Sequence, residues 1–96
     1  MSKIVRAVNF YRDKKDPMNA YTLQLLQVDT IIDRKERFFI QIITPEHGAK
    51  FDNQIVFEVS KAAAGENFRK VVMTMRSMIR PEREAWTYGD PVEQVS

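Results

Sequence analysis

The residues that could transfer protons are few. His47 is the only histidine of the chain, and it follows Glu46 in a segment that also holds Pro45 and Gly48. A histidine beside a carboxylate can exchange protons near neutral pH. No serine–histidine–acid set can be assembled without His47, and an exposed loop histidine is the simpler interpretation. We predict no catalytic residues and rank an enzyme that uses His47 as the least favoured hypothesis.

Acidic residues gather at Asp29, Asp33 and Glu36. Their carboxylates could hold a hard cation, but basic residues interleave with them and oppose its binding. The chain has no cysteine, which excludes disulfides and thiolate metal sites. Its three glycines are isolated in the sequence, so there is no glycine-rich loop to cradle a phosphate. We predict neither a metal site nor a cofactor.

The segment RFFIQII, residues 37–43, indicates a binding surface rather than a reaction centre. If Phe38, Ile40 and Ile42 face a core, the alternate side chains share the opposite face of a strand. An aromatic ring on an exposed sheet face can stack on a base while a guanidinium contacts phosphate. Arg37 and Phe39 supply that pair of groups.

From this pattern we predict a single-stranded nucleic-acid site with contacts to bases and to the backbone. Its residues are Arg37, Phe39, Gln41, Arg6, Arg12, Arg34 and Lys35. If the other face of residues 3–12 is the buried one, Tyr11 and Asn9 replace Arg6 and Arg12. The competing interpretation is that both faces of the sheet are buried. This strand is apolar on both sides, as is expected when a second layer or a second subunit covers it. Phe39 and Ile43 would then form a dimer contact.

Four segments are predicted to form strands, because β-branched and aromatic residues are frequent in them. They are residues 3–12, 20–29, 37–44 and 54–60. Tyr21, Leu23 and Leu25 alternate with polar residues, but Leu26 breaks this register. A β-bulge near Leu25–Leu26 would account for the break. A helix over residues 23–32 is the competing interpretation.

One amphipathic helix is predicted after Ser60, a candidate N-cap. Gly65 weakens its first turn, and Pro81 ends it. Its apolar stripe comprises Phe68, Val71, Val72, Met75, Met78 and Ile79. Hairpin-length connections make the sheet antiparallel. We therefore predict an α+β fold in which a four-stranded antiparallel sheet is followed by one long amphipathic helix packed on one face.

The domain organisation follows from length and composition. A chain of 96 residues has the size of one domain, and we predict a single α+β domain over residues 1–81. Residues 82–96 are predicted to be a loosely ordered tail, with Trp86 and Tyr88 as its anchors. A net charge of +2 is too mild to identify a partner. With no secretory signal and no membrane-length apolar run, we expect a cytoplasmic protein.

Three segments resemble the Pur repeat, a single-strand-binding unit. Arg37–Ile42 resembles its RFL-I strand, Gln54–Val59 the strand that follows, and Phe68–Val72 the opening of its helix. Whirly proteins and p15-type coactivators share the plan of four strands and a helix. In these families nucleic acid lies on the exposed sheet face and two units pair. The resemblance implies that role for Arg37 and Phe39 and implies a homodimer, although Glu36 stands where the Pur repeat usually has glycine.

Two functional hypotheses follow. The first is a small single-stranded nucleic-acid-binding protein that acts as a homodimer. The second is a protein-interaction module, such as a small regulator or inhibitor of a larger partner, with no nucleic-acid binding. Its contact surface would be the same strand face or residues 82–96. Salt distinguishes the two, because phosphate contacts weaken steeply as salt rises.

Overall fold

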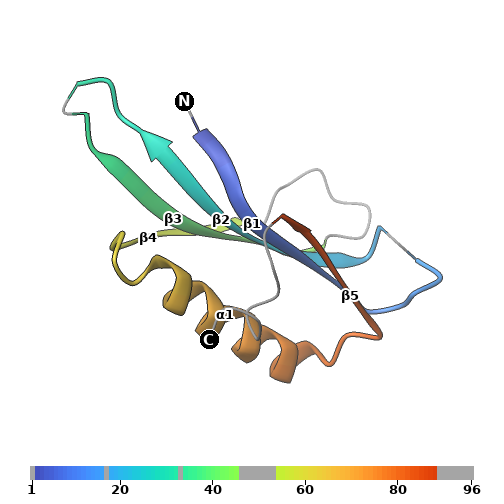
Figure 1. The fold of residues 1–96 in the computed structure, drawn as a ribbon. Helices are drawn as coiled ribbons and strands as arrows, with labels where there is room; N and C mark the ends of the chain where they lie inside the picture. Colours follow the sequence, from blue (N-terminus) through green and yellow to red (C-terminus); the bar gives the residue numbers. More distant parts are fainter. Residues whose placement is uncertain (1, 17, 33, 46–53, 89–96) are drawn as a thin grey trace.

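The computed structural model describes residues 2–16, 18–32, 34–45 and 54–88. In these ranges five strands form one antiparallel sheet in the order β4-β3-β2-β1-β5. The elements are β1 (Ser2–Tyr11), β2 (Ala20–Asp29), β3 (Glu36–Ile43), β4 (Gln54–Val59), α1 (Ala64–Ile79) and β5 (Arg83–Tyr88). Helix α1 lies against one face of the sheet and connects its two edge strands (Figure 1). The α+β class and the antiparallel sheet are confirmed.

The predicted number of strands is wrong, because β5 adds a fifth within residues predicted as tail. It pairs with the edge of β1 that β2 leaves open. Its sequence, REAWTY, has one large apolar residue pointing to the core, Trp86. Strands are predicted from alternating apolar and polar residues, and with one large apolar residue on its core side β5 shows little of this pattern.

Helix α1 has 16 residues and is shorter than predicted. Ser60 is not its N-cap, since the helix begins at Ala64 and its N-cap residue is Ala63. The Ser60 hydroxyl instead accepts a hydrogen bond from the Ala63 N–H at 3.3 Å and stabilises the preceding turn. After the helix, Arg80 has a left-handed φ of 46°, directly before Pro81. No helix in the described ranges is long and apolar enough to cross a membrane.

The core lies between α1 and the central strands. Its buried residues are Val8, Phe10, Leu23, Leu25, Ile40, Ala64, Phe68 and Val72. The predicted helical stripe supplies Phe68 and Val72 to this core, and Val71, Met75 and Ile79 pack against it. Met78 does not belong to it, because its side chain is 72% exposed.

A β-bulge does lie at Leu25–Leu26 in the pairing of β2 with β1, as predicted, but its extra residue is on β1 and not on β2. Strand β2 pairs with β3 without interruption, so Leu25 faces the core beside Ile40 while Leu26 lies beside Phe39 on the other face. The irregularity is on the facing strand, where β1 carries one extra residue between Ile4 and Arg6.

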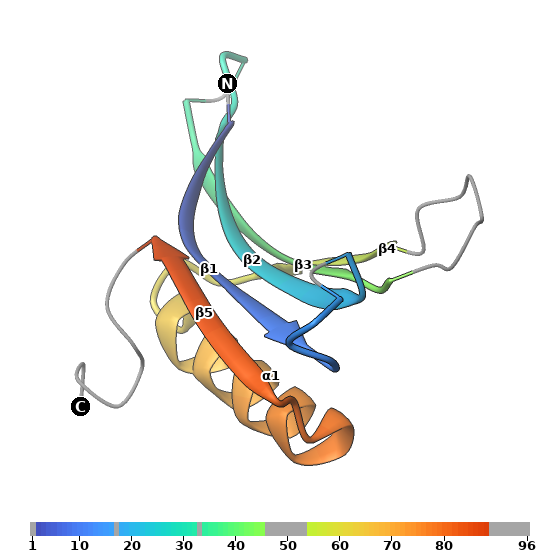
Figure 2. The same cartoon turned by 90° about the vertical axis from the view of Figure 1, so that its right-hand side faces the viewer.

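In Figure 2 the strands bend, and α1 lies beneath their lower halves.

Candidate nucleic-acid interface

The sheet has one face that packs on α1 and a second that points away from it, which we call the open face. Alternation along the strands assigns its members. They include Ile4, Ala7, Asn9, Tyr11, Ala20, Thr22, Gln24, Leu26, Val28, Arg37, Phe39, Gln41, Ile43, Val56, Glu58, Arg83 and Ala85. The predicted orientation of β3 is thus confirmed: Ile40 is buried against α1, and Arg37, Phe39 and Gln41 share the open face.

One end of the open face is formed by Arg37 and Phe39. Arg37 is exposed, and Phe39 is half-buried between Leu26 of β2 and Glu58 of β4, its cross-strand neighbours. A half-buried ring fixed by two neighbouring strands can offer its remaining surface to a base. Glu58 places one negative charge beside it, at the sheet edge.

Amide and hydroxyl groups occupy the middle of the open face. Gln24 and Gln41 face each other across β2 and β3. On the same face, two residues before Gln24, the Thr22 hydroxyl donates a 2.7 Å hydrogen bond to the Asn9 Oδ1 atom. These uncharged donors and acceptors are the kind that hydrogen-bond to base edges or sugars.

The other end of the open face holds a second aromatic and guanidinium pair. Arg83 and Tyr11 are cross-strand neighbours on β5 and β1. The Arg83 guanidinium carbon lies 4.2 Å from the Tyr11 ring centroid, which is cation–π geometry. Sequence reasoning missed Arg83 as a site residue because it missed β5. The available signal was the spacing of Glu84 and Trp86, two residues apart on the core side.

Strand β5 is held against α1 by a polar cluster and a ring contact. Glu84 accepts hydrogen bonds from the Arg76 guanidinium at 2.6 and 2.8 Å and from the Trp86 indole N–H at 2.9 Å. The rings of Trp86 and Phe68 meet edge to face, with centroids 6.3 Å apart. Because Glu84 and Trp86 point toward α1, the alternate residue Arg83 is directed to the open face.

The predicted basic residues do not form one cluster. Arg34 and Lys35 lie in the β2–β3 turn, near Arg37. Arg12 directly follows β1 and lies at the opposite end of the sheet, near Tyr11. A ten-residue strand separates these ends by about 30 Å. The open face therefore has basic residues at both ends and uncharged polar residues between them.

Arg6 is separated from the other predicted site residues. It pairs with Leu25, whose side chain is buried on the α1 side. Facing residues in an antiparallel pair share a sheet face. Arg6 alternates regularly with Val8 and Phe10 on β1 and therefore shares their α1-side face. The extra residue lies before Arg6, and it is Ile4 that it shifts, to the face of Leu26.

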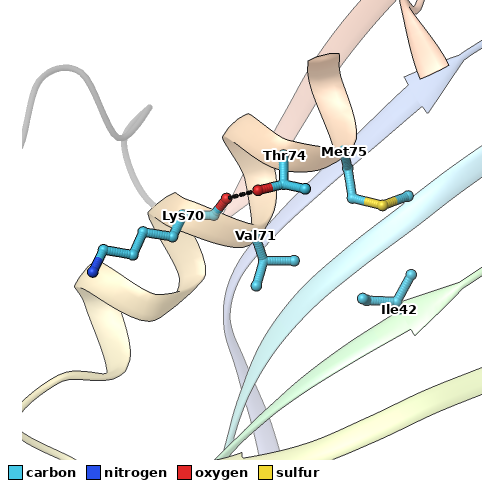
Figure 3. Close-up of a pocket in the computed structure, with 5 residues that line it drawn as sticks. All are labelled: Ile42, Lys70, Val71, Thr74 and Met75. Carbon is cyan, nitrogen blue, oxygen red and sulfur yellow. Dashed lines mark hydrogen bonds between the residues drawn. The ribbon is translucent and has the colours of Figure 1, made fainter. Parts of the chain in front are cut away.

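A shallow groove of about 290 Å³ lies on the α1 side of the sheet. Its lining residues are Ile42, Lys70, Val71, Thr74 and Met75. Figure 3 shows that the Lys70 amine extends away from Ile42, and that the Thr74 hydroxyl donates to the Lys70 carbonyl oxygen, a 2.8 Å bond within the helix. The groove is thus an apolar surface with its polar groups already engaged or directed elsewhere.

The residues considered for chemistry yield no site that can be described. His47 and Asp33 lie outside the described residues. Within the described ranges, no three His, Cys, Asp or Glu side chains are grouped so that they could hold a metal ion.

Comparisons with protein-family models, with curated proteins and with solved structures found no match. The geometry of the sheet and helix is therefore the basis for a functional proposal.

Proposed function

We propose that the open face binds single-stranded nucleic acid and that the protein acts as a homodimer in the cytoplasm. The observation that carries the proposal is the presence of an aromatic ring with a guanidinium at both ends of one sheet face. These are Phe39 with Arg37 and Tyr11 with Arg83. A cysteine-free chain suits a reducing compartment.

Each part of this face has a function in such binding. The rings stack on bases, and the guanidinium groups contact phosphates or stack with the bases themselves. Gln24, Gln41 and Asn9 offer hydrogen bonds between the two ends. The separation of the ends favours an extended single strand that crosses the sheet, because a separate stacking residue is available at each end.

The direct experiment is a fluorescence anisotropy titration of the purified protein against labelled single-stranded DNA and RNA at two salt concentrations. We expect binding whose affinity falls as salt rises, since each phosphate neutralised on a single strand contributes about −0.7 to the slope of log K against log salt. An absence of binding at low salt, where phosphate contacts are strongest, would contradict the proposal.

A protein-interaction module is the alternative function, and β4 provides an observation in its favour. Three consecutive apolar residues of that edge strand, Ile55, Val56 and Phe57, are exposed. An exposed apolar patch marks an interaction surface. Binding of a protein there would respond little to salt, so the same titration distinguishes the two functions.

A further inference from the structure

Strand β4 is an edge strand with apolar side chains on both faces. Ile55 and Phe57, which point to the α1 side, are 58% and 38% exposed, and Val56 on the open face is 51% exposed. Among the described residues β4 pairs with β3 alone, so its second edge presents unpaired backbone N–H and C=O groups (Figure 1). Such an edge is a template for another strand.

The other edge of the same sheet has protection that β4 lacks. Strand β5 carries Arg83 and Glu84, and its pairing with β1 is irregular opposite Ala7 and Val8. Charged side chains and bulges are the features by which monomeric sheets prevent edge-to-edge pairing. Strand β4, QIVFEV, has neither bulge nor proline, and Glu58 is its one charged residue.

The apolar surface of β4 continues onto α1. Ile55 is the cross-strand neighbour of Ile42, which lines the groove beside the helix together with Val71 and Met75 (Figure 3). Helix α1 thus leaves a strip of apolar surface under the β4 edge. A partner that paired with β4 would also cover this strip, which adds buried apolar area to the backbone hydrogen bonds.

We propose that the occupant of this edge is β4 of a second copy of the chain, paired antiparallel about a two-fold axis. Such an axis makes a residue face its own copy, and the central residues of β4 are Val56 and Phe57. An axis at Val56 places Glu58 opposite residue 54, a glutamine, and Ile55 opposite Phe57. An axis at Phe57 places Glu58 opposite Val56 and Ile55 opposite Val59.

Both registers avoid like charges facing each other, and both place apolar residues opposite apolar residues on the α1 side. The strand is therefore complementary to itself in charge and in hydrophobicity. This self-complementarity is why we favour a second copy over a different protein. The inference rests on the homodimer of the proposed function and not on its ligand. It predicts a continuous ten-stranded sheet in which the open faces of two copies adjoin.

The first test is the molar mass of the full chain in solution without nucleic acid, by light scattering after size exclusion. We expect twice the chain mass of 11.3 kDa. Ile55→Lys should reduce the mass to that of one chain, because it buries a charge in the pairing edge. Met73→Lys is the matched control, since Met73 on α1 is 51% exposed and lies outside β4; it should remain dimeric.

The second test uses cross-linking, because the chain has no cysteine of its own. Facing residues of an antiparallel pair have Cα atoms about 4.5 or 5.5 Å apart, within the range that a disulfide spans. We expect either Val56→Cys or Phe57→Cys to form an intermolecular disulfide rapidly on mild oxidation, and Met73→Cys to form it slowly.

Three results would overturn the inference: a single-chain mass for the wild type, a dimer that survives Ile55→Lys, or no cross-link at either β4 position. Each is measured without ligand, so none depends on nucleic-acid binding. Conversely, a dimer through β4 that binds no single strand would support the interface and remove the ligand from the proposed function.

Discussion

The Arg83 guanidinium lies over the Tyr11 ring, 4.2 Å from its centroid, and joins the last strand of the sheet to the first. The pair is far apart in sequence, and pairing of β5 with β1 brings it together. It gives the open face a second position with an aromatic ring and a cation, at the opposite end of that face from Arg37 and Phe39. An isolated Arg37–Phe39 pair would hold one nucleotide, whereas two such positions favour an extended strand.

Arg83→Gln should weaken binding of a single-stranded oligonucleotide. Loss of one phosphate contact lowers the slope of log K against log salt by about 0.7 in magnitude. Anisotropy titrations over a salt series measure this slope. Arg69→Gln, which removes an exposed arginine from α1, is the matched control and should leave the slope unchanged. Equal slopes for the two variants would remove Arg83 from the interface.

Phe39→Ala should lower the affinity for nucleic acid and Phe38→Ala the stability of the fold, because these adjacent rings lie on opposite faces of β3. Phe39→Ala should lower affinity by about 1–3 kcal/mol, the usual contribution of one stacked base, and leave the protein folded. Phe38→Ala should instead lower the free energy of unfolding by roughly 1–3 kcal/mol, less than a fully buried ring would.

Anisotropy measures the first quantity and urea denaturation the second. If Phe39→Ala unfolds the protein while oligonucleotide affinity in the folded fraction is unchanged, Phe39 belongs to the packing of the sheet and is not a stacking residue.

Glu84→Gln should destabilise the attachment of β5 to α1. The Glu84 carboxylate is mostly buried and accepts two hydrogen bonds from the Arg76 guanidinium, and a hydrogen bond to a charged group contributes about 1.5–3 kcal/mol. Urea denaturation followed by the fluorescence of Trp86, the single tryptophan, measures the loss. Glu66→Gln removes an exposed helical pair with Lys70 and should cost less than about 0.5 kcal/mol. Equal losses would show that the Glu84 cluster does not hold β5.

Gly65→Ala should stabilise the protein. Gly65 lies in the first turn of α1, and a Cβ atom added there would meet nothing within 4 Å. Alanine gains about 0.8–1 kcal/mol over glycine in a helix interior, which corresponds to a rise of several degrees in Tm for a domain of this size. Thermal unfolding by circular dichroism measures it. A lower Tm would mean that the first turn of α1 requires glycine at this position.

The sequence allowed some of this architecture to be predicted and not the rest, for physical reasons. Strand β3 is apolar on both sides, but its only polar residues after Glu36, Arg37 and Gln41, lie on the same face as Phe39. This made it possible to propose from residue types which face Phe39 occupies. Strand β5 owes its position to contacts distant in sequence, chiefly Glu84 with Arg76 and Trp86 with Phe68. The extra residue in β1, which moves Ile4 out of the alternation of Val8 and Phe10, has no local signature either, because it depends on pairing with β2.

The most direct measurement of the central claim is side-chain NMR of the wild-type protein during titration with a single-stranded oligonucleotide at low salt. We predict that the ring signals of Phe39 and Tyr11 and the amide signals of Gln24 and Gln41 shift progressively. The ring signals of Phe10, on the opposite face, should remain in place. Unchanged spectra, or shifts confined to side chains on the α1 side, would contradict nucleic-acid binding by the open face.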